Sequence, residues 1–186
     1  VDLRVLQREL AKQAKGIPIR ITLRILSDVC EALYYAHTRL DTYGRPMNVV
    51  HRDVNPRNIM ISIRGEVKLI DFGVAKADNR LDETIGHTIK GKFAYMSPEQ
   101  VERKALKPSS DVFSLGQILY RILSGRSPYK KRGMAVFHEV KNRIEFVFPE
   151  DDPNNENLPE DQWGSPLSQI IYHLSVRGPN SDSNEE

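Results

Sequence analysis

The sequence has a single cysteine, no long apolar run and little excess charge, and each shortage excludes a class of protein. Cys30 stands alone among 186 residues, so no internal disulfide can form, which favours a reducing, cytoplasmic setting. No apolar run approaches the ~18 residues of a membrane-spanning helix, and no signal-peptide pattern opens the chain. A net charge of +2, carried by scattered basic residues, argues against a nucleic-acid partner.

What is present is the composition of a soluble globular domain, with 39% hydrophobic and 28% charged residues. The chain opens at Val1-Asp2-Leu3 without an initiator methionine and runs straight into a helical pattern. We therefore expect a segment of a larger protein, with room for a membrane anchor outside it. Residues 179–186 are polar and acidic, and we expect a disordered tail there, after one domain over 1–178.

Helical periodicity runs through the first part of the chain. Residues 2–14 carry leucines at three- and four-residue spacing among charges, and residues 18–39 carry a broader apolar stripe. Both segments are predicted to be amphipathic helices. Cys30 and His37 fall on the stripe of the second helix, and we expect both side chains to pack in the core.

A helix over 109–124 is predicted to lie in the middle of the domain, because its residues are apolar nearly all round. Ser109 or Ser110 can cap its N-terminus, and Gly125 can end it. Further helices are expected at 133–145 and 165–176.

Two short β-type runs, 59–63 and 66–70, are separated only by Arg64-Gly65. A two-residue connection that ends in glycine predicts a tight hairpin in which Ile63 faces Glu66. The sequence therefore predicts a mainly α, α+β domain with one small hairpin.

The open end of that hairpin gathers polar side chains. The predicted register places Asn58 opposite Asp71, close enough for a carboxylate and an amide oxygen to share a cation such as Mg²⁺. Asp53 lies five residues before Asn58, where a general base could stand beside the metal. Alternatively, Asn58 and Asp71 are turn residues that cap the strand ends.

Three motifs surround the hairpin: His51-Arg52-Asp53 with Asn58, then Asp71-Phe72-Gly73, then Ser97-Pro98-Glu99. In this order and spacing they resemble the catalytic loop, the metal-binding motif and the end of the activation segment of eukaryotic-type protein kinases. The run from Gly91 to Tyr95 is most similar to the eukaryotic-like kinases of bacteria. The resemblance spans roughly residues 2–176 and implies the large C-terminal lobe of a kinase, a helical bundle around a buried central helix.

The resemblance also implies roles for individual residues. Asp53 would accept or orient the proton of the substrate hydroxyl, and Asn58 and Asp71 would hold Mg²⁺ against the phosphates of ATP. Met60 falls where the family places the apolar floor under the adenine. Asp2 falls where an acidic residue contacts the ribose.

Other matching positions have structural roles in the family. His51 and Phe72 would stack in its internal spine, and Asp111 would hydrogen-bond to the backbone of the catalytic loop. These side chains would hold the site together without contacting the substrate.

Regulation is implied by Arg52, which precedes Asp53. In the family such an arginine marks kinases that are switched on by phosphorylation of the activation segment, here residues 71–99. Thr84 and Thr88 are the candidate phosphorylation sites, and Lys76 could give the phosphate a second positive contact. The alternative is that both threonines are ordinary loop residues.

The sequence departs from the family at two positions near the transferred phosphate. Serine/threonine kinases usually carry lysine where this chain has Asn55, and threonine where it has Lys92. We hypothesise that Lys92 supplies the missing ammonium group and is a catalytic residue. A third departure concerns Glu99, for which no partner arginine is found near the C-terminus, so we expect this carboxylate to lack its partner.

The fourth departure is larger, because the chain shows no glycine-rich loop and no strand with a Val-Ala-x-Lys-type lysine. Half of the ATP pocket would then come from residues before Val1. We expect the chain by itself to bind ATP weakly and to transfer phosphate poorly or not at all.

The predicted function is that of a serine/threonine protein kinase, which transfers the γ-phosphate of ATP to serine or threonine hydroxyls of a protein substrate. Pro56 and the Tyr95 to Glu99 run resemble serine/threonine kinases more than tyrosine kinases. Two alternatives stay open. One is a pseudokinase-like scaffold that binds a partner, and the other is a small-molecule phosphotransferase, a class that lacks an activation segment ending in Pro-Glu.

Overall fold

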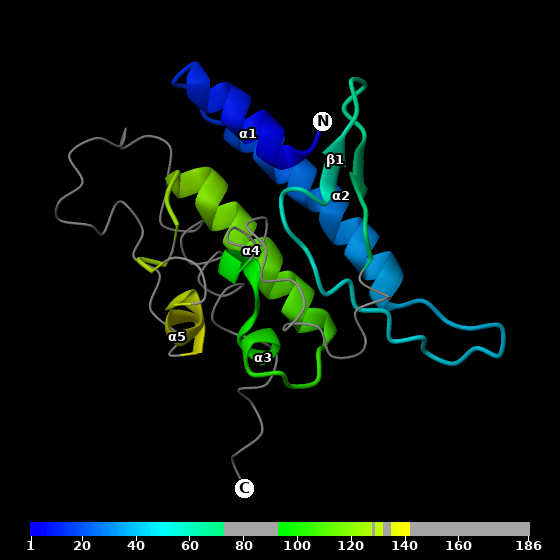
Figure 1. The fold of residues 1–186 in the computed structure, drawn as a ribbon. Coiled ribbons are helices and arrows are strands. Elements are labelled where there is room, and N and C mark those ends of the chain that lie inside the picture. The colour runs from blue at the N-terminus through cyan, green and yellow to red at the C-terminus, as the bar shows by residue number, and fades with distance from the viewer. Residues whose placement is uncertain (73–92, 128, 132–134, 142–186) are drawn as a thin grey trace, which may run out of the picture.

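A computed structural model describes residues 1–72, 93–127, 129–131 and 135–141. The helix predicted at 165–176 and the tail predicted at 179–186 lie outside these residues. Within them the fold is mostly helical with one small antiparallel sheet (Figure 1). The elements are α1 (Leu3–Lys12), α2 (Ile19–His37), β1 (Ile59–Ile61), β2 (Val67–Leu69), the 3₁₀-helix η2 (Phe93–Tyr95), α3 (Pro98–Val101), α4 (Pro108–Ser124) and α5 (Val136–Lys141). No helix in these described ranges is both long and apolar enough to cross a bilayer.

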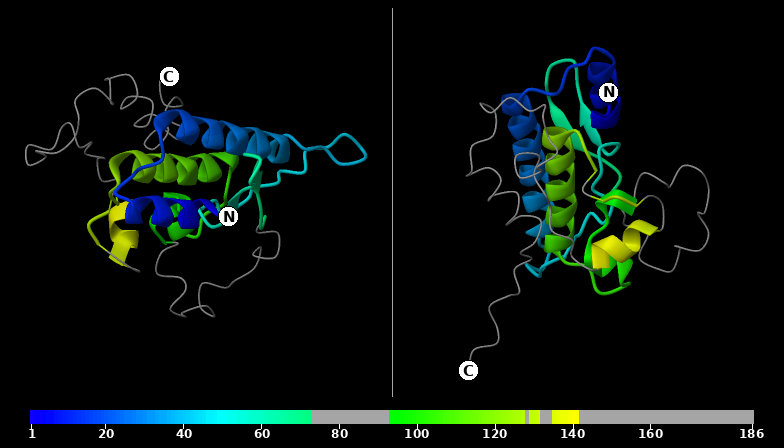
Figure 2. Two further views of the ribbon diagram at one scale, coloured as in Figure 1. Left: turned by 90° about the horizontal axis from the view of Figure 1, so that it is seen from above. Right: turned by 90° about the vertical axis from the view of Figure 1, so that its left-hand side faces the viewer.

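The central helix is α4, as predicted. It runs antiparallel to α2 and packs against it (Figures 1 and 2), and its buried residues face several directions, among them Ser114, Gln117 and Ile118. It ends where expected, at Gly125, which takes the left-handed φ of 65° that a helix C-cap favours. Its start differs from the prediction. The N-cap is Lys107, because Pro108 is well suited to the first helical position and Ser110 instead caps from inside the helix.

The buried face of α2 is narrower than the sequence suggested. Its core positions are Thr22, Ile25, Leu26, Val29, Leu33 and Ala36. Cys30 is exposed, so the expectation that it packs in the core is wrong. His37 is not a simple core residue either, because its ring hydrogen-bonds to a carboxylate of α4. Val29 lies on the buried face, and Cys30, about 100° further round the helix, falls beyond its edge.

The hairpin forms, but its register differs by one residue from the prediction. Ile59 pairs with Leu69 and Ile61 with Val67, so Asn58 lies beside Ile70 and not opposite Asp71. The loop has three residues, 63–65, and its last residue Gly65 has a φ of 81°. The hydroxyl of Ser62 accepts hydrogen bonds from the backbone N–H groups of residues 64 and 66. This side-chain turn selects the longer connection over the two-residue one.

A second, smaller core lies where η2, α3 and α5, which Figure 2 shows close together, meet. Ala94 of η2 packs there with Tyr129 and with Val136 and Val140 of α5. The rings of Phe93 and Phe137 meet edge to face at 4.9 Å. This core supports Tyr95 and α3 against α4.

Candidate active site

The loop of residues 49–58, which precedes β1, is anchored by one buried carboxylate of α4. Asp111 is 1% exposed, and its two oxygens accept 2.8 Å hydrogen bonds from the backbone N–H groups of His51 and Arg52. The same carboxylate accepts a 2.8 Å hydrogen bond from Nε2 of His37. The expectation that Asp111 binds the backbone of this loop is confirmed. A buried carboxylate with three donors is well satisfied, and it joins α2, the loop and α4.

Arg52 has an unusual backbone, with a left-handed φ of 69°. A non-glycine residue in this region costs roughly 1–2 kcal/mol, so its surroundings must hold it there. Asp111 binds its N–H, and the side chain of Gln100 donates a 2.7 Å hydrogen bond to its carbonyl oxygen. Gln100 is itself fixed by a capping box with Ser97 at the start of α3. The Pro-Glu motif thus helps to shape the loop.

His51 is buried, and its neutral ring connects the loop to the residue that follows β2. Its Nε2 lies 3.0 Å from the carbonyl oxygen of Ile70, and its Nδ1 accepts a 3.3 Å hydrogen bond from the N–H of Asp53. Both bonds fit the neutral ring protonated at Nε2. Burial lowers the pKa of His51, although the Ile70 carbonyl and nearby carboxylates oppose that change. Its ring contacts that of Phe72 at 4.5 Å and a tilt of 51°, so the predicted ring contact is present.

Asp53 is held by two asparagines. The amide nitrogen of Asn55 donates to both its backbone oxygen, at 2.9 Å, and its Oδ1, at 3.0 Å. The amide nitrogen of Asn58 donates to the same backbone oxygen at 2.7 Å. Asn55 is 2% exposed, and its own oxygen accepts from the N–H of Arg57. The carboxylate of Asp53 is therefore oriented before any substrate arrives.

Asn55 is the residue that sequence reasoning undervalued. At this position the sequence indicates a departure from the family's lysine, whereas the structure gives Asn55 the bonds that orient Asp53. A signal was present, because asparagine side chains in turns commonly bond to backbone groups two residues away, as Asn55 does at Asp53 and Arg57.

Asn58 and Asp71 lie at the open ends of β1 and β2, where a divalent cation was predicted. The N–H of Ile70 bonds to the carbonyl oxygen of Asn58, so Asp71 is one residue beyond the last pair. Asn58 is 5% exposed and uses its amide nitrogen on Asp53, so Oδ1 is the atom with which it would bind the predicted cation. Asp71 is exposed, with a left-handed φ of 59°.

The donor set suits magnesium. The described ranges contain no group of three or more His, Cys, Asp or Glu placed to hold a metal. One carboxylate and one amide oxygen are the kind of site that Mg²⁺ uses when it keeps several waters and binds substrate phosphates. The residues present therefore fit the predicted cofactor.

Asp2 and Met60, predicted to contact the nucleotide, are brought together by a backbone bridge along the free edge of β1. Val1 and Ile61 exchange hydrogen bonds beside this bridge, at 2.8 and 3.0 Å. Asp2 also caps α1, since its Oδ1 accepts a 2.8 Å hydrogen bond from the N–H of Val5. Met60 follows Asn58 by two residues, so the residues predicted to contact the nucleotide and those predicted to bind the cation are neighbours in the chain.

The remaining predicted residues divide into two groups. Lys76, Thr84, Thr88 and Lys92 lie outside the described residues. Glu99 is described, and it is hydrogen-bonded, because the hydroxyl of Ser110 in the first turn of α4 donates to it. That it lacks a partner arginine stays a prediction, since residues 142–186, where that arginine was sought, lie outside the described residues.

Comparison with known proteins agrees with this geometry. The model of the protein kinase domain matches residues 3–180. The chain is 38% identical to the tyrosine-protein kinase MasK of Myxococcus xanthus over 167 residues, 90% of this chain and 26% of that protein. It is 36% identical to the serine/threonine-protein kinase PknB of Mycolicibacterium smegmatis over 124 residues, 66% of this chain and 19% of that protein. It is 39% identical to the serine/threonine-protein kinase A of a Synechocystis strain over 110 residues, 57% of this chain and 21% of that protein. The chain thus spans about a quarter or less of each of these relatives.

Proposed function

The chain belongs to the protein kinase family, and from this premise we propose that it is the large lobe of a kinase that phosphorylates serine or threonine hydroxyls of proteins. The observation that carries the proposal is the bonding of Asp53, Asn55 and Asn58 into one unit that Asp111 anchors to the central helix. A protein that only binds a partner has no need for the Asp53 carboxylate and the Asn58 amide to be fixed beside the open end of the hairpin, where Asp71 offers a further carboxylate.

In this proposal the residues act mainly by positioning. Asp53 accepts the hydrogen bond of the incoming hydroxyl and takes its proton as the oxygen bonds to the γ-phosphorus of ATP and the bond between that phosphorus and the departing ADP breaks. Asn58 and Asp71 would hold Mg²⁺ through their oxygens, and the bound ion would supply positive charge beside the ATP phosphates. Met60 supplies an apolar surface for the adenine, and Asp2 lies beside it for the ribose. Lys92 is proposed to place a positive charge near the transferred phosphate.

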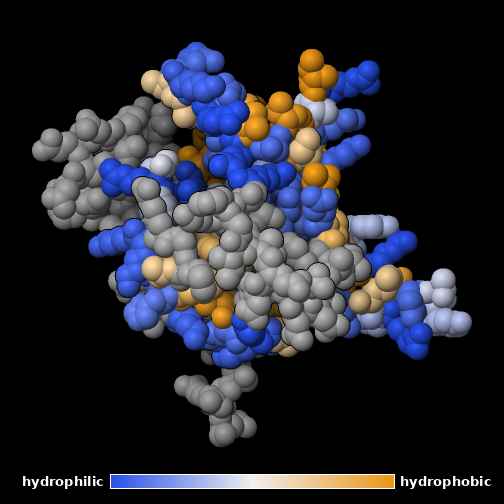
Figure 3. Space-filling view, viewed as in Figure 1, coloured by the Kyte–Doolittle hydropathy of each residue, from blue (hydrophilic) through white to orange (hydrophobic). Residues whose placement is uncertain are grey.

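Exposed apolar side chains support the assignment to a large lobe. Ile63 is fully exposed, Val1 is 65% exposed and Ile70 is 37% exposed. Figure 3 shows apolar side chains gathered over the hairpin end of the molecule, on a face that is otherwise largely hydrophilic. An exposed apolar surface of this kind is typical of a site where another domain or protein packs. We propose that a small lobe covers it and completes the ATP pocket, and that the 186 residues alone transfer phosphate poorly.

The residue that accepts phosphate has a second candidate. MasK is named a tyrosine-protein kinase, and it matches 90% of this chain. PknB and kinase A are named serine/threonine-protein kinases. We favour serine or threonine because of Pro56 and the Tyr95 to Glu99 run. We propose that Arg52 binds a phosphate group carried by Thr84 or Thr88 when the kinase is activated, with Lys76 as a second contact.

The test is phosphate transfer by the full-length protein and its Asp53→Asn variant. We expect the variant to lose about 100-fold or more in kcat, since it can no longer take the proton, while Mg²⁺-ATP still binds. Asp28→Asn, a half-buried aspartate of α2 that pairs with Arg24, is the matched control. Hydrolysis of the product to free phosphoamino acids would show whether serine, threonine or tyrosine carries the label. Unchanged partner binding by an inactive parent protein would favour the scaffold instead.

A further inference from the structure

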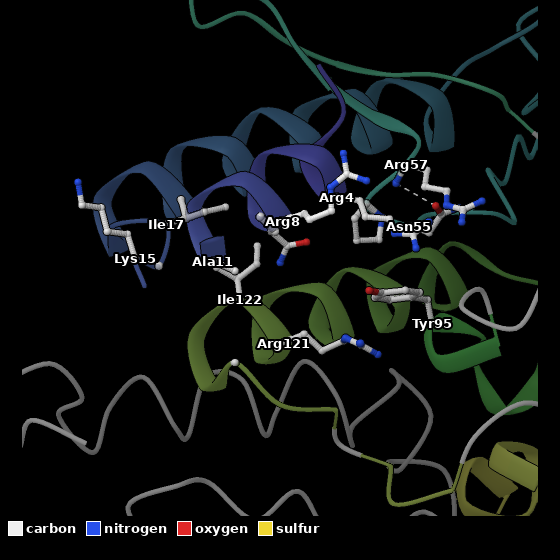
Figure 4. Close-up of a pocket in the computed structure, with 14 residues that line it drawn as sticks. Arg4, Arg8, Ala11, Lys15, Ile17, Asn55, Arg57, Tyr95, Arg121 and Ile122 are labelled. Carbon is white, nitrogen blue, oxygen red and sulfur yellow. Dashed lines mark hydrogen bonds between the residues drawn. The ribbon is translucent and has the colours of Figure 1, made fainter. Parts of the chain in front are cut away.

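A basic pocket of about 460 Å³ lies between α1 and α4, beside the catalytic loop (Figure 4). Its walls come from α1, from Asn55 to Arg57 of the loop, from Tyr95 and from the end of α4. The described residues that line it include no aspartate or glutamate. They include five cations, which are Arg4, Arg8, Lys15, Arg57 and Arg121.

Three of these cations gather at the end of the pocket nearest the loop. Figure 4 shows Arg4, Arg57 and Arg121 around Tyr95 and Asn55, with Lys15 at the far end of α1. The guanidinium of Arg121 lies 5.2 Å from the centre of the Tyr95 ring. Burial raises the pKa of Tyr95, and the charges of Arg121 and Arg4 partly oppose this, so both arginines act on the same hydroxyl. The positive charge is thus concentrated at one spot.

Within the described part of the chain, that charge is not neutralised by the protein itself. None of the ion pairs formed there involves Arg4, Arg57 or Arg121, whereas Arg8 pairs with Glu9 at 3.2 Å. Like charges held close together repel, and a bound anion relieves the repulsion. A carboxylate can also accept two parallel hydrogen bonds from one guanidinium group, which makes arginine the preferred partner for it.

The pocket adjoins Asp53 through a single side chain. Asn55 forms part of its wall, and the amide of Asn55 binds the Asp53 carboxylate. The opposite wall is fixed to the same loop, because the N–H of Arg4 bonds to the carbonyl oxygen of Pro56 at 3.3 Å. Tyr95 is fixed by a 2.7 Å hydrogen bond from the Ser114 hydroxyl to its carbonyl oxygen. A peptide whose hydroxyl reaches Asp53 therefore passes the mouth of this pocket.

We propose that the pocket binds an acidic side chain of the protein substrate, so that this kinase selects acceptors with aspartate or glutamate within a few residues. The inference rests on the proposed function, since it places a phosphorylated hydroxyl at Asp53. A phosphorylated serine in the substrate offers the same anionic chemistry. The neighbouring cations raise the rate of encounter as well as the affinity, and salt weakens both.

The test is a set of peptides phosphorylated by the full-length protein. One glutamate is moved through each of about four positions on either side of the acceptor, and glutamine and phosphoserine peptides are matched to it. We expect glutamate to exceed glutamine by about tenfold in kcat/KM at one or two positions, a difference that added salt reduces. Phosphoserine at those positions separates a phosphate source from a carboxylate source.

Two variants and a control connect the preference to the pocket. Arg121→Glu and Arg4→Glu should each reduce the glutamate-to-glutamine ratio about tenfold and shift preference towards lysine at the same position. Arg4 is exposed on α1, so its variant keeps the test valid if Arg121→Glu unfolds the protein by losing its contact with Tyr95. Arg20→Glu, an exposed arginine on α2 outside the pocket, should leave the ratio unchanged.

Binding separates this proposal from the proposed function. A glutamate peptide with alanine at the acceptor position is titrated against the protein by fluorescence anisotropy. If all peptides are phosphorylated equally and Arg4→Glu changes no ratio, the pocket proposal is wrong while the kinase assignment stands. If no peptide is phosphorylated but the acidic peptide binds, and Arg4→Glu weakens that binding about tenfold, the pocket stands and the kinase assignment fails.

Discussion

Two irregular segments of this protein are organised around an aspartate, and they differ in how that aspartate is supported. The loop after α2 carries Asp41, which accepts hydrogen bonds from the N–H groups of Tyr43 and Arg45 and from the Arg45 side chain. All of these partners lie within four residues of Asp41 in the sequence. The loop of Asp53 is bonded inside itself as well, but it is also fastened to α4, α3, α1 and the hairpin end.

The difference between the two loops shows what a surface turn needs in order to position a functional side chain. Local bonds between a short polar side chain and nearby N–H groups are enough to shape a surface loop, and they form wherever the residues allow. They do not fix the loop relative to the rest of the molecule. Bonds from distant elements do so, and they hold Arg52 in a left-handed conformation that a free loop would leave.

The largest test of this comparison removes the distant anchor. Asp111→Ala leaves the N–H groups of His51 and Arg52 and the ring of His37 without their acceptor. We expect a loss of about 3 kcal/mol in the free energy of unfolding, because buried donors are left unsatisfied. Asp41→Ala in the surface loop is the matched control, with an expected loss below about 1 kcal/mol. Urea denaturation followed by circular dichroism measures both, and equal losses would contradict the distinction.

A second test, with a smaller expected effect, removes the hydrogen bond to the Asp53 carboxylate but keeps the Asp111 anchor. Asn55→Ala deletes the amide that binds the Asp53 carboxylate, and we expect kcat of the full-length protein to fall about 10- to 100-fold. If Asn55 only stabilises the loop, kcat will be kept in the fraction that stays folded. Thr42→Ala, in the surface loop, is the control and should not change kcat. Thermal unfolding of each variant shows how much of the loss is structural.

The smallest test uses pH, because the two loops respond in different ranges. Burial holds the pKa of His51 below its ordinary value near 6.5. As the pH falls through this range, the unfolded chain therefore binds a proton more readily than the folded chain. Stability therefore rises with pH through this range and falls as the pH drops from about 7 towards 5. The pKa of Asp41 is lowered by its hydrogen bonds, so its contribution is lost only below about pH 4. Replacing His51 with glutamine should flatten the urea midpoint between pH 7 and 5, and Asp41→Asn should not.

The helices could be predicted from the sequence because their spacing carries the information. α1, α2 and α4 lie within a few residues of the predicted ranges, and the central position of α4 follows from its apolar residues. The depth of burial at one position could not be predicted as well. Whether Cys30 or Val29 faces the core depends on where neighbouring elements contact α2, and no local pattern contains that.

The candidate site residues are predicted from motifs, and three details of their surroundings that the motifs do not contain are bonds made by side chains. The hydroxyl of Ser62 sets the hairpin loop, the hydroxyl of Ser110 meets Glu99, and the amide of Asn55 orients Asp53. Each is a short polar side chain with several possible partners nearby. The partner is chosen by the folded backbone, so the sequence alone leaves the choice open.

The backbone ladder between Val1 and Ile61 has a consequence for how the molecule assembles. These residues are separated by 60 positions, so a long loop must close before the ladder gains its first bond. A hairpin of two three-residue strands is marginal without such support. We expect the helices to fold early and the strands that end at Asn58 and Asp71 to become ordered late. Until the ladder forms, we expect the helices to be present while the proposed cation site is still incomplete.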